Sequence, residues 1–451
     1  MRLHFIAIGG SAMHSLALEM KSLGYQVTGS DDVIFEPSKS KLEAVGLIPE
    51  RFGWFPEKID PGIDVVVLGM HAKKDNPELI RAQEINLNIK SYPEFLAQLT
   101  ETKTRVVIAG SHGKTTITAM VLHVLNYHDI KPDYMVGAPV SKNTKTLSIT
   151  EKNDFVLLEG DEYLSSPIDS RPKFLWYTPE IALISGIAWD HVNVFPTFED
   201  YVSQFNQFIS SIQAGGVLIY NQEDKVLKKL VDSSEHPIKK IGYSTPDHYI
   251  EGGTSYLETE EGSLPLLVFG SHNLQNLAGA QWIAQLMGLD RSDFYEAIPS
   301  FEGASKRLEL LKKGTNSFLY KDFAHAPSKV KATSLAVRNQ FEGKKIVICL
   351  ELHTYSSLDP EFIGQYAKSL DTADEILIFY DPEALRIKNR VAIPPETIEQ
   401  SFEHSSLQVF TQALLLQNNL FERSFTNEVL VMMSSGNFGG MDWEKLIGRF
   451  L

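Results

Sequence analysis

The chain has 451 residues, of which 43% are hydrophobic and 22% charged. This composition is typical of folded proteins, and the length exceeds what one hydrophobic core serves, so we expect two to four domains, most simply three. The formal net charge of −15 argues against general binding to nucleic acid or to an anionic membrane. The sequence has no basic signal-peptide start and no run of 18 apolar residues, which predicts a cytoplasmic protein.

Short apolar runs alternate with amphipathic segments along the whole chain, a pattern typical of α/β domains with largely parallel sheets. The first hundred residues predict one such unit. Its expected elements are a strand at Leu3–Ile8, a helix at Met13–Leu23, and strands at Gln26–Asp31 and Asp64–Leu68.

A glycine turn follows the first strand and opens the first helix, and an aspartate ends the next strand about 20 residues later. This arrangement is typical of a dinucleotide-binding site. The turn is not a G-x-G-x-x-G, however, so a UDP-sugar fits as well as NAD. A tight strand-to-helix turn that binds no ligand is a further alternative. The segment after the third predicted strand, Gly69–Ala72, is placed to line the same crevice. The residues assigned to this site are Gly9, Gly10, Ser11, Ala12, Met13, Asp31 and His71.

The polar stretch Thr100–Thr104 predicts a linker, because a fresh strand at Arg105–Ala109 begins directly after it. That strand leads into a glycine-rich heptad and then a helix, which predicts a phosphate cradle and ATP as its ligand. The heptad consists of Gly110, Ser111, His112, Gly113, Lys114, Thr115 and Thr116.

Two side chains of the heptad carry the expected chemistry. Lys114 reaches the β- and γ-phosphates, and Thr115 offers its hydroxyl to a phosphate-bound magnesium ion. The loop is shorter than the usual G-x-x-x-x-G-K-[ST], since Ile108 stands where the first glycine would fall. The alternative is that Gly-Lys-Thr begins a helix by chance and binds no phosphate.

The next predicted strands, Phe155–Leu158 and Ile181–Ile184, are followed by acidic and histidine-bearing turns. Carboxylate and imidazole groups at such strand ends suit magnesium held beside phosphates. One carboxylate of the turn Glu159–Glu162 with Thr115 would hold a first ion, and His191 a second. Without the phosphate loop, Asp190-His191 would read equally well as a turn cap.

A small-residue helix is predicted over Gly270–Ala280, where Asn273 and Asn276 lie one turn apart and can face one ligand. A simple N-capped helix is the alternative. A domain boundary is expected near Pro299–Gly303. Beyond it, the Arg307 guanidinium could bind phosphate or carboxylate, and Asp322 could accept hydrogen bonds from ribose hydroxyls. Taken alone, either residue is equally well explained as part of a surface ion pair.

The last third predicts a smaller α/β domain, and its apolar runs contain the single cysteine, Cys349, as a buried strand thiol. With one cysteine, no disulfide framework or cysteine metal site can form. The strands are expected at Ser317–Tyr320, Lys345–Leu350, Glu375–Phe379 and Glu428–Met433. The predicted domains are therefore residues 1–100, 101–300 and 301–451.

In this order and spacing, the segments resemble the ATP-dependent Mur ligases of peptidoglycan synthesis across essentially the whole chain. Gly110–Thr116 is similar to that family's G-[ST]-x-G-K-T-T cradle, and Asp322–Pro327 to its D-F-A-H-A-P segment. The first turn resembles the UDP-binding domain of the muramate-recognising members. The resemblance implies a Rossmann-like N-terminal domain, a central P-loop ATPase-type domain and a C-terminal Rossmann-like domain.

Among the members that start from UDP-N-acetylmuramate, the sequence leans to those that add a salvaged tripeptide rather than L-alanine. Glu159–Tyr163, Lys173-Phe174 and the turn Met433–Gly440 are similar to the tripeptide-adding enzymes. One departure concerns Glu351–Ser357, which differs from their E-P-R-S-N-T pattern. Contacts to the incoming peptide therefore cannot be carried over.

The resemblance implies ATP and Mg²⁺ as cofactors and an acyl phosphate made from the muramate carboxylate. It assigns catalysis to Lys114, Glu159, His191 and Arg307, the adenine side to Asn273 and Asn276, and the ribose to Asp322. His325 is a weaker candidate, and domain closure on binding is expected. Two other classes stay open at this point: a nucleotide-binding regulator without turnover, and an NAD-dependent oxidoreductase.

Overall fold

The structure is a computed structural model that describes residues 1–138, 145–189, 194–305, 307–354, 356–383 and 393–450. They form two compact units. The first contains Met1–Ile187, Thr197–Tyr243 and Gly279–Asp290, and the second contains Ala188–Pro196, Ser244–Ala278 and Arg291–Leu451. The predicted boundaries near residues 100 and 300 stay predictions.

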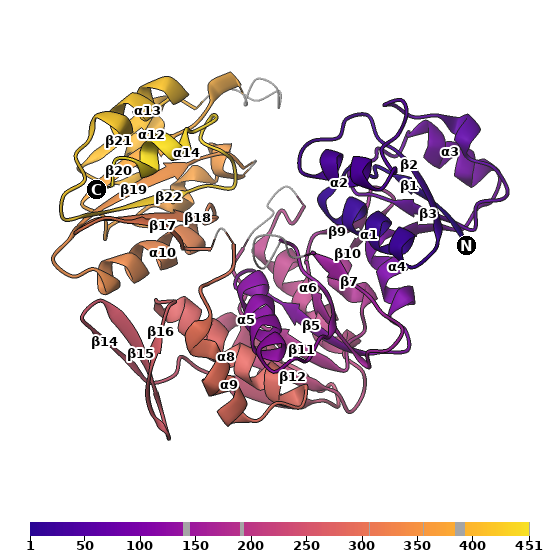
Figure 1. The fold of residues 1–451 in the computed structure, drawn as a ribbon, viewed down its shortest axis with the longest axis horizontal. Coiled ribbons are helices and arrows are strands. Elements are labelled where there is room, and N and C mark those ends of the chain that lie inside the picture. Colours follow the sequence, from indigo (N-terminus) through magenta and orange to yellow (C-terminus); the bar gives the residue numbers. More distant parts are fainter. Residues whose placement is uncertain (139–144, 190–193, 306, 355, 384–392, 451) are drawn as a thin grey trace. The chain divides into compact units, whose positions relative to one another are not determined.

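The N-terminal part of the first unit is a parallel four-stranded sheet in the order β2-β1-β3-β4. Val65 to Leu68 are buried on both faces, as expected for a covered parallel strand. Helices α1 and α4 pack on this sheet (Figure 1). The elements are β1 (Arg2–Ile6), α1 (Ser11–Ser22), β2 (Gln26–Ser30), α2 (Ser38–Ala44), η1 (Pro56–Lys58), β3 (Val65–Leu68), α3 (Pro77–Glu84), β4 (Ile89–Ser91) and α4 (Tyr92–Leu99).

The first predicted strand, Leu3–Ile8, was two residues too long. Strand β1 ends at Ile6 because Ala7 has a φ of 66°, which turns the chain out of the extended conformation. The first helix begins at Ser11 instead of Met13. The chain therefore leaves the sheet just before the predicted glycine turn.

The central sheet of the first unit has the order β13-β12-β11-β5-β8-β6-β7, and only the β6–β7 pair is antiparallel. Strand β5 lies between β8 and β11, so the three strands end at one edge. The strands are β5 (Thr104–Ala109), β6 (Asp133–Met135), β7 (Leu147–Ser148), β8 (Phe155–Glu159), β11 (Ile181–Ile184), β12 (Val217–Asn221) and β13 (Lys239–Tyr243). Around them lie α5 (Lys114–Tyr127), the hairpin β9 (Leu164–Ser166) and β10 (Asp169–Pro172), η2 (Lys173–Trp176), α6 (Phe198–Ser211) and α7 (Lys225–Ser233).

The predicted linker is short, and hydrogen bonds hold it against the neighbouring elements. Between α4 and β5, Thr100 and Lys103 are buried, and the Arg105 side chain donates to the carbonyls of Ala97 (2.5 Å), Thr100 (3.2 Å) and Tyr177 (3.1 Å). These bonds fasten the end of the N-terminal sheet's last helix to the central sheet within one compact unit.

The second unit contains a six-stranded sheet in the order β17-β18-β22-β19-β20-β21, parallel except for β17–β18. All four predicted strands are present, but the edge strands β17 and β21 were not predicted. The strands are β17 (Glu309–Lys313), β18 (Phe318–Asp322), β19 (Lys345–Glu351), β20 (Glu375–Phe379), β21 (Leu407–Phe410) and β22 (Glu428–Met433). The helices are α9 (Arg291–Ala297), η3 (Ile298–Ser300), α10 (Pro327–Gln340), η4 (Ser356–Leu358), η5 (Ile363–Tyr366), α12 (Pro395–Phe402), α13 (Ala413–Glu422) and α14 (Trp443–Ile447).

A three-stranded antiparallel sheet in the second unit departs from the predicted parallel pattern. It consists of β14 (His248–Glu251), β15 (Thr254–Thr259) and β16 (Gly262–Leu266). The Gly252-Gly253 pair closes a two-residue hairpin between Glu251 and Thr254, and this dipeptide was the overlooked signal. Helix α8 (Ser271–Leu286) follows it and contains the division between the two units.

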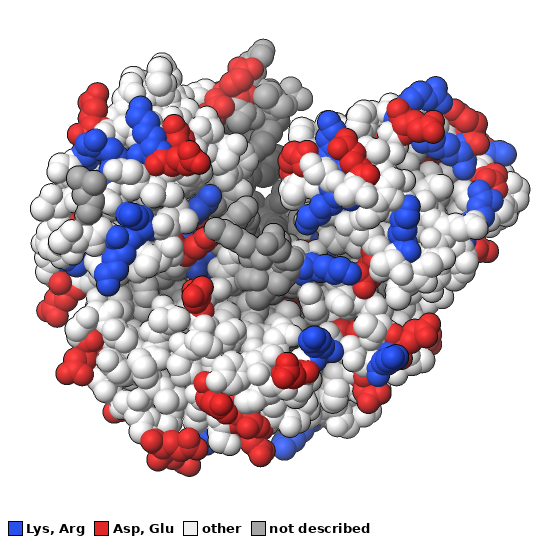
Figure 2. Space-filling model, in the orientation of Figure 1, with Lys and Arg blue, Asp and Glu red and all other residues white. Residues whose placement is uncertain are grey.

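Cys349 is fully buried in β19, as predicted, and burial raises the pKa of its thiol. Among the described residues, no helix is long and apolar enough to cross a membrane. On the face visible in Figure 2, acidic and basic side chains are interspersed. A surface of mixed sign accords with the moderate excess of acidic residues in the sequence.

Candidate active site

The glycine-rich heptad forms the predicted loop between β5 and α5. Gly110 has a φ of 123°, and a Cβ there would overlap the Ser185 hydroxyl and lie 2.9 Å from the Ser185 nitrogen. Gly113 has a φ of 77° and is the N-cap of α5, which has no side-chain cap. The amides of a first helical turn have no intrahelical partner, so this helix start can bind an anion.

Lys114 is held among oxygen atoms at the start of α5. Its Nζ donates to the Gly110 carbonyl (2.6 Å) and to Glu162 Oε2 (2.7 Å). Burial lowers its pKa, but the charges of Glu162 and Asp161 outweigh burial, so the net shift is upward. Lys114 is therefore a permanent cation in this loop at neutral pH.

A residue that sequence reasoning missed connects to this lysine. The Tyr201 hydroxyl, from α6, donates to Glu162 Oε1 (3.0 Å) and lies 2.7 Å from Ser111 Oγ. Glu162 was quoted as part of the acidic turn but given no role, and Tyr201 had no local signal because it lies 90 residues after Ser111. Together they fix the loop and its lysine.

Thr115 and Glu159 meet as the metal prediction required. Thr115 Oγ1 donates to Glu159 Oε1 (2.8 Å), and the Gly137 amide donates to Oε2 (2.7 Å). Both side chains are buried. Hydroxyl and carboxylate oxygens are hard donors that suit Mg²⁺, which keeps few protein ligands. His191 lies outside the described residues, and among those described no cluster of three metal-ligating side chains occurs.

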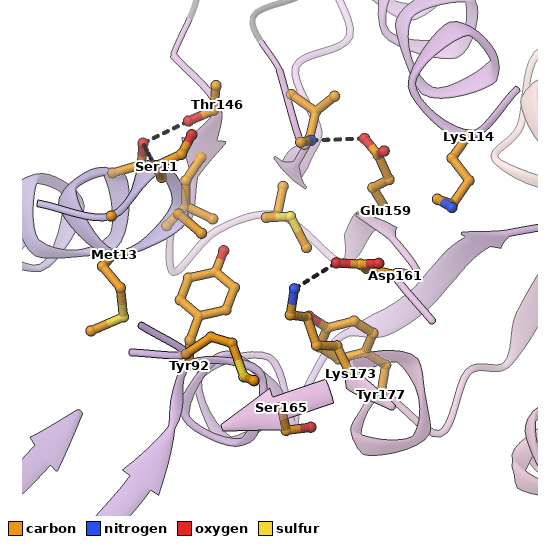
Figure 3. A pocket seen from close by; sticks show the side chains of 18 of the residues that line it. Ser11, Met13, Tyr92, Lys114, Thr146, Glu159, Asp161, Ser165, Lys173 and Tyr177 are labelled. Atoms are coloured by element: carbon orange, nitrogen blue, oxygen red, sulfur yellow. Dashed lines mark hydrogen bonds and ion pairs between the residues drawn. The ribbon is translucent and has the colours of Figure 1, made fainter. Parts of the chain in front are cut away.

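The structure brings the N-terminal turn and the phosphate loop to one pocket of about 390 Å³ (Figure 3). This volume lies in the usual range for small-molecule sites. The predicted residues that line it are Gly10, Ser11, Ala12, Met13 and His71 from the N-terminal turns, and Lys114 and Glu159 from the central sheet. Two sites inferred separately from the sequence therefore share one cavity.

Gly9 and Asp31, both assigned to the nucleotide site, contact each other. The Gly9 amide donates to Asp31 Oδ2 at 2.7 Å. Burial raises the pKa of Asp31 to about 6, against the opposing effect of the Gly9 amide. Gly10 is the N-cap of α1 and makes no side-chain cap, so the first amides of α1 are available to a phosphate.

The predicted nucleotide residues of the C-terminal half lie in the second unit. Asn273 Nδ2 donates to the Phe269 carbonyl (2.9 Å). Asp322 accepts from the Ala324 amide (3.1 Å) and the Thr333 hydroxyl (2.7 Å). Burial lowers the pKa of His272, opposed by the charge of Asp322, so the start of α8 and the end of β18 face each other.

Three further predicted residues lie near these. The Arg307 guanidinium stacks over the Phe323 ring at 4.6 Å. His325 Nδ1 lies 2.8 Å from the Phe323 carbonyl, and the Tyr366 hydroxyl donates to the His325 carbonyl. Asn276 is buried on α8. The structure does not assign a ligand to any of them, and their roles stay predictions.

Adjacent strands β19 and β22 bring together two segments that the sequence suggested separately. The buried Glu351 carboxylate accepts from the Ser434 hydroxyl and from the Phe438 amide (2.8 Å). His353 Nδ1 lies 3.9 Å from Glu351 Oε1. The departure from the tripeptide-adding pattern therefore lies directly against the turn Met433–Gly440, which resembles it.

A phosphate loop and a buried hydroxyl–carboxylate pair on the central sheet, with a nucleotide-type turn on the N-terminal sheet, are typical of an ATP-dependent enzyme that transfers a phosphoryl group. Residues 2–104 match the Mur ligase family catalytic domain, and residues 108–284 match the Mur ligase middle domain. The UDP-N-acetylmuramate–L-alanine ligase of Caldicellulosiruptor bescii is 31% identical over 87% of this chain and 86% of its own. The chain belongs to the Mur ligase family, whose members are ATP-dependent ligases that form amide bonds.

The relatives include ligases named for L-alanine and ligases named for the tripeptide. The UDP-N-acetylmuramate–L-alanyl-γ-D-glutamyl-meso-2,6-diaminoheptandioate ligase of Escherichia coli is 28% identical over 99% of this chain and 98% of its own. Among solved structures, a murein peptide ligase from Psychrobacter arcticus aligns with a TM-score of 0.67, 22% identity and coverage of 100% and 98%. The UDP-N-acetylmuramate–alanine ligase from Thermotoga maritima aligns with a TM-score of 0.72 and 21% identity, over 97% of this chain and 96% of its own. These two structures confirm the three-domain α/β fold.

Proposed function

We propose that this enzyme joins UDP-N-acetylmuramate to the tripeptide L-Ala-γ-D-Glu-meso-diaminopimelate, with release of ADP and phosphate. The observation that carries the proposal is the shared pocket, in which the turn Gly10–Met13, the phosphate-loop residue Lys114 and Glu159 at the end of β8 line one cavity. A sugar nucleotide bound at the first turn would extend toward the phosphate that activates it.

The proposed reaction has two steps. The carboxylate of UDP-N-acetylmuramate attacks the γ-phosphorus of ATP, so that an acyl phosphate forms and ADP leaves. The free amine of the tripeptide then attacks the acyl carbon, the amide bond forms, phosphate leaves and the amine loses a proton. Activation is required because a carboxylate is a poor electrophile.

The described side chains support the first step by electrostatics. Lys114, charged and pointed into the pocket (Figure 3), would offset the charge that builds on the transferring phosphoryl group. Thr115 and Glu159 would hold Mg²⁺, which supplies further neutralisation of phosphate charge. Gly137, through its amide, keeps the Glu159 carboxylate in place.

The remaining assignments are part of the same proposal. His191 would hold a second ion, Arg307 would contact phosphate or the acyl intermediate, and Asn273 with Asn276 would face adenine. Asp322 would accept from ribose, and both its oxygens keep a lone pair beyond the two bonds already made. Gly9, Gly10, Ser11, Ala12, Met13, Asp31 and His71 would bind the UDP-sugar.

The choice of the tripeptide rests on the extent of the similarity. The relative named for the tripeptide reaction aligns over 99% of this chain, and the turn Met433–Gly440 is similar to that group. L-alanine is the second candidate, because alanine ligases at 31% identity are also relatives. Both candidates share the activation step.

The deciding experiment gives the purified protein ATP, Mg²⁺ and UDP-N-acetylmuramate and measures phosphate release with either amine. We expect the tripeptide to be used at least ten times faster, with the amide product seen by mass spectrometry. A faster rate with L-alanine would establish the second candidate. No product with either amine, while ATP still binds, would establish the regulator without turnover.

A further inference from the structure

One short turn places two hydrogen-bond donors on the wall of the pocket. The 3-10 helix η2 begins at Lys173, and Tyr177 follows its end. The turn is anchored because the Lys173 amide donates to the Tyr163 carbonyl (2.9 Å) and the Phe174 amide to the Asp161 carbonyl (3.1 Å). Phe174 is fully buried and stacks on Phe208 at 4.6 Å. The two donors are therefore held by a rigid support.

The Tyr177 hydroxyl is the first of these donors. The side chain is fully buried, yet its hydroxyl has no hydrogen-bond partner among the residues that the structure describes. An unsatisfied buried hydroxyl destabilises the fold, so it needs an explanation. Because Tyr177 lines the pocket, a ligand can supply the missing acceptor. Burial and the neighbouring Tyr92 raise its pKa well above the usual value, which keeps it a donor.

The Lys173 ammonium is the second donor. Its Nζ lies 2.5 Å from Asp161 Oδ2, and the side chain is 23% exposed on the pocket wall (Figure 3). Asp161 is itself held, since its Oδ1 accepts from the Tyr163 amide at 3.1 Å. An ammonium carries three protons, and the bond to Asp161 uses one of them. The pair thus fixes the position of a cation and leaves protons for a ligand.

The position of these donors indicates which ligand group they meet. The pocket is lined by the N-terminal turn, where the nucleotide of a UDP-sugar would bind, and by Lys114 and Glu159, where phosphoryl transfer would occur. The sugar's carboxylate must lie between nucleotide and phosphate for the reaction to happen. We infer that Lys173 and Tyr177 form the subsite that receives this carboxylate and select a sugar nucleotide that bears one, an inference that rests on the proposed function.

The charges of Lys173 and Asp161 determine how strongly this subsite favours a ligand with a carboxylate. Asp161 offsets the charge of Lys173, so the subsite attracts an anion less strongly than a lone ammonium would. Tyr177 adds a neutral donor without an opposing charge. We therefore expect a selectivity of about tenfold from Lys173 and about threefold from Tyr177, within the usual range for hydrogen bonds to a charged group.

The test compares two ligands that differ in one group. UDP-N-acetylmuramate carries the lactyl carboxylate and UDP-N-acetylglucosamine lacks it, and both are titrated into the full-length protein by calorimetry without ATP. We expect Lys173→Met to weaken binding of the first about tenfold and of the second less than twofold. Tyr177→Phe should weaken the first about threefold and raise Tm by about 1–3 °C, because it removes an unsatisfied buried hydroxyl.

Matched variants control for the loss of a buried pair or hydroxyl. Lys90→Met removes a partly buried lysine that pairs with Glu94 at 3.3 Å, and Tyr243→Phe alters a buried tyrosine; neither residue lines the pocket. Both should leave the ratio of the two affinities unchanged. If Lys173→Met weakens both ligands equally or neither, the inference is overturned, whereas a wild-type protein that binds neither ligand overturns the proposed function itself.

Discussion

In the second unit, the carboxylates at the ends of β18 and β19 accept from neighbouring loops and from helix α10, Asp322 from Ala324 and Thr333, and Glu351 from Ser434 and Phe438. In the first unit, Glu159 at the end of β8 likewise accepts from a loop amide, but strand ends and turns also direct donors into a pocket. Lys114 and Lys173 are two of these donors, each with one carboxylate partner.

This contrast separates two uses of the same architecture. Parallel sheets gather polar side chains at the carboxyl ends of their strands in both units. Where acceptors serve backbone amides, the loops gain fixed shapes, as in the turn that Glu351 holds. Where donors face a cavity, an anion can bind, as phosphoryl and carboxyl chemistry requires. Substitutions on the two sides should therefore affect activity and local stability differently.

The largest effect is expected for Lys114→Ala. Removal of the cation should lower the rate of amide formation about 10²–10³-fold, because nothing else in the loop replaces its charge on the transferring phosphate. The measurement is single-turnover product formation with UDP-N-acetylmuramate at saturating ATP. The variant Lys90→Met serves as control, and a loss smaller than fivefold would remove Lys114 from the catalytic group.

The next effect belongs to the second unit. Glu351→Ala would leave the Ser434 hydroxyl and Phe438 amide without their acceptor, at a cost of about 2–3 kcal/mol in local stability. Amide hydrogen exchange at Phe438 should accelerate about 30- to 100-fold, while UDP binding to the first unit stays unchanged. Unaltered protection at Phe438 would show that the turn does not depend on this carboxylate.

A smaller effect is expected from pH at the N-terminal turn. Asp31 has a pKa of about 6, and its ionised form is the stronger acceptor for the nucleotide and the Gly9 amide. Its ionised fraction falls as pH drops through 6, so UDP affinity should weaken about fourfold between pH 7.5 and 5.5. Asp31→Asn should flatten the profile. A wild-type profile that stays flat over this range would contradict the shifted pKa or the contact.

The sequence predicted well those features that depend on neighbouring residues. The heptad Gly110–Thr116 carries its glycines where the backbone needs positive φ, and β8 and β11 were visible as apolar runs. The rule that parallel strands end at one edge predicted a carboxylate after β8 near Thr115, and the choice of Glu159 came from the family resemblance.

What could not be predicted depends on distant residues. Tyr201 meets Ser111 across 90 residues, and Tyr177 reaches the pocket only because Phe174 is packed against α6. Tyr201 has no local pattern that marks it. The hairpins of β14–β16 were missed for a different reason, because their short strands have little hydrophobic periodicity and the local Gly252-Gly253 signal was overlooked.

The smallest effect is expected where a pocket hydroxyl already has a partner within the protein. Thr146 Oγ1 and Ser15 Oγ lie 2.7 Å apart, and Ser15 also donates to the Ser11 carbonyl at 3.1 Å. Thr146→Val should therefore cost about 0.5–1 kcal/mol and change UDP-N-acetylmuramate affinity less than twofold, since Ser15 keeps a bond.

Thermal unfolding and calorimetry on Thr146→Val, beside Tyr177→Phe, compare two hydroxyls that line the same pocket. The Thr146 hydroxyl has a protein partner, and the Tyr177 hydroxyl has none in the part of the chain that the structure describes. We expect the first substitution to lower Tm slightly and spare binding, and the second to raise Tm and weaken binding. A tenfold loss of affinity in Thr146→Val would mean that this hydroxyl also contacts the ligand. A hydrogen bond within the protein would then not prevent a pocket side chain from binding the ligand as well.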